Sequence, residues 1–254
     1  KAHFEKVPAE KLTMGMVLET ANYPVVETGE VADYDPYTHA IFCAYGHSHG
    51  ETGRKALTLF DTEMCLLPTI KGEVLSKEEY KDFKNAIILL ERNLPEKDFV
   101  PLNLNKEGRL SWIAGLIDAD GEQSANQDSA DIRLCGIEEH LYERVQLLLT
   151  TLGTHSTISG NTFSICGSEL TNLIQLGLKT TKPLRSLPIN QQLKPPVFIA
   201  SVNKSYTAAE VFCFTEPLRG LGCFEGIITG QCAEIVLESY EPCNLVELAL
   251  PRLG

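Results

Sequence analysis

Residues 112–123 read WIAGLIDADGEQ, and this stretch decides the fold of the chain. It is apolar, rich in small residues, and it ends abruptly at Asp120 and Gly121. Such a composition favours a packed helix, and an Asp-Gly pair is a signal that ends one. The stretch therefore predicts a core helix that carries a carboxylate at its C-terminal tip.

The same pattern occurs 75 residues earlier in the chain. Residues 37–46, YTHAIFCAYG, align without a gap on residues 112–121, WIAGLIDADG. Small residues coincide at the same helical spacing, as where Ala40 aligns with Gly115, and each copy ends in a glycine. An internal match of this kind predicts two structural repeats.

Similar segments follow the predicted helix in both copies. Alternating, strand-like residues at 56–60 align with residues 131–135. Helical stretches are then predicted at 76–93 in the first copy and at 138–153 in the second.

The second copy continues further than the first. Two short strands are separated by Gly160 and Asn161, which is a hairpin signal. Residues 168–178 have helical apolar spacing and open with a serine N-cap at Ser168. The second copy therefore reads as an αββαββα unit, and the first is a less complete version of it.

Two equivalent helices with small residues at every fourth position can pack closely along their backbones. This packing brings their C-terminal tips together on a pseudo-twofold axis. An acid at each tip would form a shared site for divalent ions, which suits hydrolysis of phosphodiesters.

The motif is similar to that of a known family. Residues 113–121, IAGLIDADG, match the LAGLIDADG motif of homing endonucleases at every position but the first. The resemblance implies an α+β fold with pseudo-twofold αββαββα repeats at 31–105 and 106–190, together a domain over 31–190. It also implies an Mg²⁺-dependent enzyme that cuts double-stranded DNA.

In this family the last acid of the motif coordinates Mg²⁺, which implies a catalytic metal site at Asp120 with the adjoining Gly121. Asp118 is then a structural residue. The first copy departs from the pattern, because Tyr45 stands where the matching acid belongs. A phenol is a poor ligand for Mg²⁺ at neutral pH.

The residues after Tyr45 leave two interpretations open. His47, His49 and Glu51 could replace the missing acid, or GHSHGE could be a polar loop. The sequence favours the loop.

The charge of the chain bears on DNA binding. The formal net charge is −12 at pH 7, whereas a nucleic-acid binder usually carries a basic face. The residues that we expect to contact DNA are Arg54, Lys55 and Arg133. The resemblance therefore secures an endonuclease fold better than an active endonuclease.

The C-terminal part resembles the C-terminal splicing segment of an intein. Residues 201–232 contain AEVFCFTEP and then FEGIITGQC. The resemblance implies a catalytic role for Cys213 in the strand, cyclisation of Gln231, and Cys232 as the nucleophile after the insert. The alternative is that residues 210–231 are a simple β-hairpin edge.

Glycines replace two histidines that inteins commonly carry. Gly230 precedes the terminal Gln231, and Gly220 or Gly222 lies where another catalytic histidine is common. Loss of a general acid or base typically costs about 10²–10⁴-fold in rate, so slow or absent splicing is expected.

The last residues resemble a segment of the ribonucleotide reductase large subunit. In residues 232–254, Cys-x-Glu-Ile is followed by Cys-Asn-Leu-x-x-Leu. The resemblance implies that Cys232 is half of a redox-active thiol pair, that Cys243 is the thiyl-radical site, and that Asn244 lies nearby.

These matches divide the chain into four parts. Residues 1–30 are predicted as part of a β-rich, partial Hint (intein) splicing lobe, and residues 191–231 as the C-terminal splicing segment. They flank the endonuclease domain, and the reductase segment 232–254 is expected to have little core of its own. The partners implied are double-stranded DNA, the missing N-terminal intein half and the remainder of the reductase.

Composition adds a cellular setting. The chain has 254 residues, of which 43% are hydrophobic, and its eight cysteines form no Cys-x-x-Cys pair. These features predict a reduced, cytoplasmic protein of a phage, viral or microbial host cell, without a membrane segment. Three functions stay open: an intein-borne homing endonuclease, a decayed endonuclease kept as a splicing scaffold or DNA-binding remnant, and a reductase piece with the intein as passenger.

Overall fold

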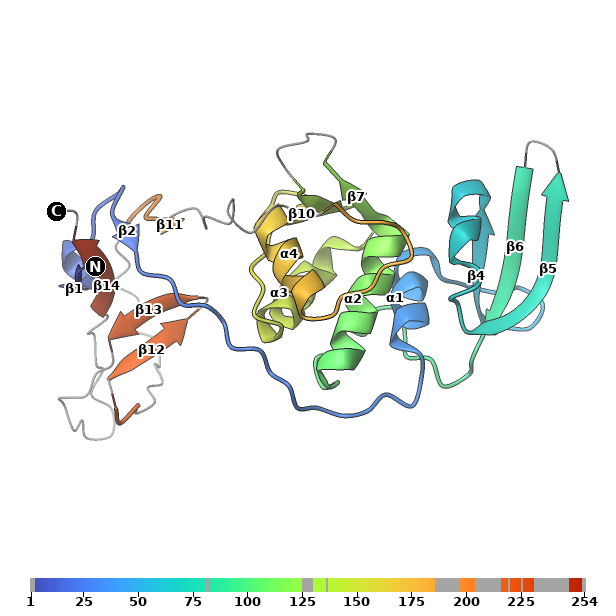
Figure 1. Cartoon of the computed structure of the whole chain (residues 1–254), viewed down its shortest axis with the longest axis horizontal. Coiled ribbons are helices and arrows are strands. Elements are labelled where there is room, and N and C mark those ends of the chain that lie inside the picture. Colours follow the sequence, from blue (N-terminus) through green and yellow to red (C-terminus); the bar gives the residue numbers. More distant parts are fainter. Residues whose placement is uncertain are drawn as a thin grey trace. The chain divides into compact units, whose positions relative to one another are not determined.

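The computed structural model separates the chain into two compact units, shown in Figure 1. One unit contains Tyr23–Leu193, and the other combines Lys1–Asn22 with Lys194–Gly254. The structure describes residues 3–80, 83–124, 130–135, 137–185, 197–203, 216–218, 220–224, 226–230 and 247–252.

The first repeat of the larger unit contains one α-helix and one antiparallel sheet. The sheet has the strand order β3-β4-β6-β5, in which the long hairpin β5–β6 forms one side (Figure 1). The elements are α1 (Pro36–Tyr45), β3 (His47–Ser48), β4 (Lys55–Phe60), the 3₁₀ helix η2 (Asp61–Leu66), β5 (Gly72–Tyr80) and β6 (Phe83–Leu90).

The helix predicted over 76–93 is wrong, because this segment lies in strands β5 and β6. In β6 the side chains of Ala86, Ile88 and Leu90 point toward the core at a spacing of two residues. The charged run SKEEY suggests a helix, but pairing of β6 with both β4 and β5 determines the backbone conformation.

The second repeat confirms the predicted order αββαββα. Its sheet has the order β7-β8-β10-β9, and the hairpin turns at Gly160, whose φ is +54°. The elements are α2 (Lys106–Asp120), β7 (Gly121–Gln123), β8 (Ile132–Leu134), the 3₁₀ helix η3 (Glu139–Leu141), α3 (Tyr142–Thr151), β9 (Thr157–Ser159), β10 (Thr162–Ile165) and α4 (Gly167–Gln175).

The helices begin at side-chain or backbone caps. Asp35 accepts a hydrogen bond from the backbone of Thr38 at the start of α1, and Asn105 caps α2 in the same way. The serine cap predicted for the last helix is wrong. Its N-cap residue is Cys166, and the carboxylate of Asp131 accepts the first N–H of the helix, from Gly167, at 2.7 Å.

Two hydrophobic cores meet at the α1–α2 pair. The core of the second repeat contains Ala40 and Cys43 of α1 as well as residues of α2 to α4. The core of the first repeat contains Ile41 and Phe42 of α1 together with Ala119 of α2. Each helix therefore contributes to both cores, which makes the pair the centre of this unit.

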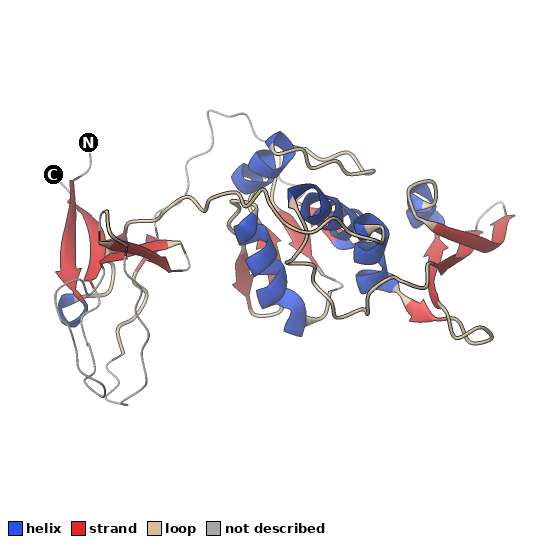
Figure 2. Cartoon of the chain, turned by 90° about the horizontal axis from the view of Figure 1, so that it is seen from below, coloured by secondary structure: helices blue, strands red, loops and turns tan. Residues whose placement is uncertain are grey.

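In the part that the structure describes, the smaller unit contains strands and the short 3₁₀ helix Ala9–Lys11 (Figure 2). Its sheet has the order β1-β14-β13-β12, and a second pair joins β2 to β11. The strands are β1 (His3–Pro8), β2 (Val17–Leu18), β11 (Val197–Phe198), β12 (Leu221–Phe224), β13 (Ile227–Gly230) and β14 (Glu247–Arg252).

The division between units differs from the predicted boundaries. Residues 23–30 belong to the larger unit, where Val25 bridges to Leu152 and Glu30 to Leu104. Strand β14, in the segment that resembles a reductase, pairs with β1 and β13. Among the described residues, none of the helices is long and apolar enough to cross a membrane.

Candidate functional site at the α1–α2 helix pair

The backbones of α1 and α2 approach closely at the residues that the internal repeat aligns. A Cβ atom built on Gly115 would lie 3.0 Å from the Cβ of Ala40 and only 2.3 Å from the backbone oxygen of Tyr37. Only glycine fits there without displacing the helix. The prediction that these two helices pack against each other is confirmed.

The helix ends are also equivalent. Gly46 and Gly121 cap α1 and α2, and each donates its N–H to the carbonyl four residues earlier, at Phe42 and Ile117. A Cβ atom at either position would lie 2.5 Å or less from atoms of those same residues. The two tips therefore require glycine for a steric reason, since φ is negative at both.

Tyr45 occupies the tip of α1 and binds the tip of α2. Its hydroxyl donates a hydrogen bond to the backbone oxygen of Ala119. Burial, together with the carboxylates of Glu63 and Asp120, raises the pKa of Tyr45 to about 12. At neutral pH the Tyr45 phenol is protonated and donates this proton to the Ala119 carbonyl in a hydrogen bond. It therefore offers no negative charge to a metal ion.

Asp120 ends α2 in a partly exposed position. Its charge acts on the groups around it. The pKa of the Cys135 thiol is raised by burial, by Glu122 and by Asp120, and the pKa of Tyr142 is raised in the same way by burial, Glu139 and Asp120. Asp120 is therefore the carboxylate at the meeting point of the two helix tips, as the motif predicts.

The side chains near the tips do not assemble a two-acid metal site. His47 lies 3.4 Å from the hydroxyl of Thr58, and His49 lies 3.1 Å from that of Thr52. Within the described ranges, no three His, Cys, Asp or Glu side chains are grouped so that they could hold a metal ion. Of the two acids that the family resemblance implies at the tips, the chain carries Asp120, and the phenol of Tyr45 stands in place of the other.

Asp118 has the structural role predicted for it. It is fully buried, and its carboxylate accepts the backbone N–H groups of Thr181 at 2.6 Å and Lys182 at 2.8 Å. The hydroxyl of Tyr37 donates to it at 2.8 Å. Asp118 therefore holds the chain that follows α4 against both helices.

The candidate DNA contacts of the first repeat are engaged inside the protein. Arg54 donates to Glu73 at 3.2 Å and to the backbone oxygen of Leu90 at 3.0 Å. Lys55 donates to Glu96 at 2.7 Å, and its side chain lies on the side of the sheet that faces Phe42 of α1.

The third candidate lies on the outer face of the second sheet, away from the core. Arg133 is exposed between the buried residues Ile132 and Leu134, and its partner across the strands is Glu122. Among the three candidates, only Arg133 stands on an outer sheet face, where a carboxylate neighbours it.

The remaining predicted site residues lie outside the described residues. These are Cys213, Gln231, Cys232, Cys243 and Asn244. The described residues just before Gln231 form the hairpin β12–β13, in which Gly222 pairs with Thr229 and Leu221 with Gly230. The roles of these five residues stay predictions.

A buried polar chain beneath the helix tips was not predicted. The indole of Trp112 donates to Nδ1 of His39 at 3.1 Å, and Nε2 of His39 lies 3.1 Å from the backbone oxygen of Glu96. Burial lowers the pKa of His39 to about 4, so the ring is neutral at pH 7. A histidine in an apolar helix face was the signal that could have revealed it.

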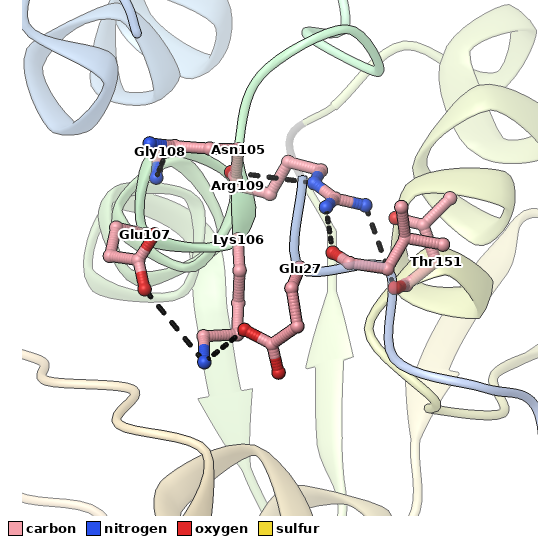
Figure 3. Close-up of polar contacts among 8 residues, drawn as sticks. Glu27, Asn105, Lys106, Glu107, Gly108, Arg109 and Thr151 are labelled. Atoms are coloured by element: carbon pink, nitrogen blue, oxygen red, sulfur yellow. Dashed lines mark hydrogen bonds and ion pairs between the residues drawn. The ribbon is translucent and has the colours of Figure 1, made fainter. Parts of the chain in front are cut away.

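The start of α2 contains a second unpredicted network, shown in Figure 3. The guanidinium of Arg109, which is 1% exposed, donates to the backbone oxygens of Val26 and, at 3.5 Å, of Thr151. Lys106 pairs with Glu27 at 2.5 Å. Arg109 therefore joins the incoming segment 23–30 to α2 and α3.

Comparison with known proteins identifies the central motif. Residues 107–174 match the LAGLIDADG-like domain. This segment covers α2 to nearly the end of α4, which is the second repeat. This part of the chain is therefore similar to a LAGLIDADG-like domain.

A second comparison concerns the whole chain. The ribonucleoside-diphosphate reductase large subunit of Invertebrate iridescent virus 6 is 30% identical over 264 residues, a match that covers 93% of this chain. The chain spans about a quarter of that relative's length, or 27%.

Solved structures resemble parts of the chain at low sequence identity. The N-terminal LAGLIDADG domain of DUF199/WhiA has a TM-score of 0.43 and 11% identity, covering 65% of this chain and 95% of its own. The homing endonuclease I-DmoI, in complex with DNA and Mn, has a TM-score of 0.37 and 13% identity, covering 56% and 93%.

Proposed function

We propose that this chain is part of a ribonucleotide reductase large subunit that carries an intein. We further propose that Tyr23–Leu193 is the homing-endonuclease-type domain of that intein, in a form that does not cleave DNA. The observation that carries the proposal is the hydrogen bond from Tyr45 to Ala119, beside Asp120, where the family places a second acid.

The chemistry at the helix tips supports loss of cleavage. Mg²⁺ binds oxygen ligands, chiefly carboxylates, and it neutralises charge that develops on a phosphate. Here Asp120 is opposed by a phenol whose pKa is about 12 and whose proton is donated to a backbone carbonyl. One carboxylate and one neutral hydroxyl supply half of the charge that a two-acid site provides.

The contacts of the basic residues support the same conclusion. Arg54 and Lys55 form ion pairs with Glu73 and Glu96, so their charges are already balanced within the protein. Arg133 is the basic residue left on an outer sheet face among the three candidates. Tight binding to a duplex requires several phosphate contacts from Lys and Arg.

The setting in a reductase rests on two observations. A match over 93% of the chain includes most of the LAGLIDADG-like segment, so the viral large subunit carries a counterpart of it. Residues 232–254 also carry the two cysteine-centred motifs that resemble the reductase. In this proposal Gln231 and Cys232 form the splicing junction, and the protein acts in the cytoplasm of an infected or microbial host cell.

An active nuclease is the second candidate function. It is favoured by the nearly complete motif at 113–121 and by the position of Asp120 at the end of α2. In this case one carboxylate would suffice to bind the divalent ion.

A cleavage assay distinguishes the two candidates. The chain is incubated with Mg²⁺ or Mn²⁺ and a supercoiled plasmid that carries the uninterrupted reductase sequence. We expect no linear product, and no difference between wild type and Asp120→Asn. A linear product that the wild type forms and Asp120→Asn does not would overturn the proposal in favour of the active nuclease.

A gain-of-function variant tests the role of Tyr45. In Tyr45→Asp the second acid is restored opposite Asp120, and we expect Mn²⁺ to raise the melting temperature of the variant but not of the wild type. Tyr45→Asn is the matched control, since it removes the phenol without adding a charge. Stabilisation of the wild type by Mn²⁺, lost in Asp120→Asn, would contradict the proposal.

The splicing junction is tested separately. The chain is mixed under reducing conditions with a polypeptide that carries the N-terminal splicing half. We expect slow release of a fragment that ends at Gln231, and no release from Gln231→Ala, which lacks the side-chain amide that cyclises. If wild type and Gln231→Ala behave alike, the junction is not competent.

A further inference from the structure

The outer face of the first-repeat sheet, opposite α1, carries an exposed aromatic cluster. Phe60 of β4, Tyr80 of β5 and Phe83 of β6 are 47%, 65% and 40% exposed. Tyr80 pairs with Phe83 across the strands, and the ring centroids of Phe60 and Phe83 lie 6.2 Å apart. We call these three residues the aromatic face. Contiguous exposed aromatic side chains are typical of interaction surfaces.

Carboxylates surround the aromatic face. Glu78, on the same side of β5, accepts a hydrogen bond from Asn85 at 3.2 Å. Glu63 accepts the backbone N–H of Phe60 at 3.0 Å, and Asp61 accepts that of Lys84 at 2.9 Å. These acceptors place negative charge beside the aromatic rings.

The described basic residues of the same hairpin, Lys77 and Lys84, do not balance that charge. Lys77 lies opposite Ala86, on the other side of the sheet, where it pairs with Glu79 at 3.3 Å. Lys84 is on that side too, since it pairs with Glu79 across the strands. The aromatic face is therefore acidic on its own side, and a phosphate backbone is repelled there.

We propose that the aromatic face binds an arginine-rich protein segment. Guanidinium groups stack on aromatic rings through cation–π interactions and pair with carboxylates, so both features of the face fit one cation. The net charge of −12 also favours a basic partner over a second copy of this chain.

The segment lies on the face and does not extend the sheet. Strand β5 is an edge strand, and its register shifts between Val74 and Ser76 at a bulge. Three consecutive charged residues, 77–79, follow the bulge. A bulge and charges along an edge are features that prevent another strand from pairing there.

This inference goes beyond the proposed function, which assigns no role to the aromatic face. The test is fluorescence polarisation of the full chain with three labelled probes: a peptide of alternating arginine and glycine, the same peptide with glutamate for arginine, and a short DNA duplex. We expect binding of the arginine peptide, weakened by added salt, and no binding of the other two.

Variants locate the binding site. Phe83→Ser is expected to weaken arginine-peptide binding about tenfold, and Glu78→Gln about threefold. The matched controls are Val31→Ser, another exposed apolar residue, and Glu143→Gln, an exposed acid on α3, and both are expected to leave binding unchanged.

Three outcomes would overturn the inference. The first is tighter binding of the duplex than of the arginine peptide, and the second is an equal effect of Phe83→Ser and Val31→Ser. The third is self-association in sedimentation velocity that Phe83→Ser abolishes, because this would assign the aromatic face to a second copy of the chain.

Discussion

In each repeat of the larger unit the first helix ends at a capping glycine, but the last residue of that helix differs between the two repeats. In the second repeat α2 ends in Asp120, and the full αββαββα order is present. In the first repeat α1 ends in Tyr45, and the 3₁₀ helix η2 is the helical element between its strand pairs.

The comparison shows which features the fold itself needs. Both repeats keep the small residues of the helix contact and the capping glycines. A Cβ atom added at Gly115, Gly46 or Gly121 would lie 3.0 Å or less from atoms of the neighbouring residues, so larger side chains do not fit. The acid is retained in one repeat only. Close packing of the helices is therefore independent of the chemistry at their tips.

The outer faces of the two sheets also differ in chemistry although the fold is shared. Arg133, Ser164 and Thr157 give the second sheet a polar outer face. The corresponding face of the first sheet carries Phe60 and Phe83. Two repeats with one fold thus present surfaces of different chemistry.

Substitution of Gly115 should have the largest effect, since it removes the helix contact that both repeats share. In Gly115→Val a Cβ would lie 2.3 Å from the backbone oxygen of Tyr37. We expect a loss of about 3 kcal/mol or more in the free energy of unfolding, measured by urea denaturation. Gly50→Ala, where no atom lies within 4 Å, is the control and should change stability by less than about 0.5 kcal/mol.

The pH dependence of stability should report on His39 of α1, whose ring lies between Trp112 and the segment that joins the repeats. Its pKa is lowered by burial from 6.5 to about 4 in the folded protein. Between these two pH values the unfolded chain binds one more proton than the folded protein. The contribution of His39 to the free energy of unfolding is therefore fully present above pH 6.5 and is lost as the pH falls toward 4.

The size of this loss should be about 3 kcal/mol, measured by urea denaturation at successive pH values. His39→Gln should be less stable at pH 7 and have a flatter profile over the same window. The exposed His140→Gln is the control. An unchanged profile in His39→Gln would show that another group causes the dependence.

Arg109 and Lys106 both hold segment 23–30 at the start of the second repeat. Arg109 does so through buried hydrogen bonds and Lys106 through an exposed ion pair. Arg109→Met leaves the carbonyls of Val26 and Thr151 without their donor, and should cost about 2 kcal/mol of unfolding free energy. Lys106→Met removes a surface ion pair with Glu27 and should cost much less than Arg109→Met, because exposed ion pairs contribute little to stability. Equal effects in thermal denaturation would contradict the assignment.

The hydroxyl of Tyr45 should contribute less to stability than the guanidinium of Arg109. Tyr45→Phe removes the hydrogen bond to Ala119 and keeps the ring in the first core, so we expect a loss of about 1 kcal/mol. Tyr34→Phe is a matched control, because its buried hydroxyl has no hydrogen-bond partner among the described residues, and it should cost less. A larger loss in Tyr34→Phe would contradict the role of the Tyr45 bond.

The sequence by itself determined the centre of this protein. The stretch 112–123 and its copy at 37–46 predicted two packed helices with glycine-capped tips, and Gly160 predicted the hairpin of the second repeat. These features are local, because one residue's size or backbone freedom decides each of them.

The tertiary structure decided the rest. Strand pairing turned residues 76–93 into a hairpin, and distant carboxylates and carbonyls engaged Arg54 and Lys55. Whether a basic side chain is available to a ligand depends on which groups lie opposite it across a sheet or a loop. The residue spacing within one segment does not predict those partners.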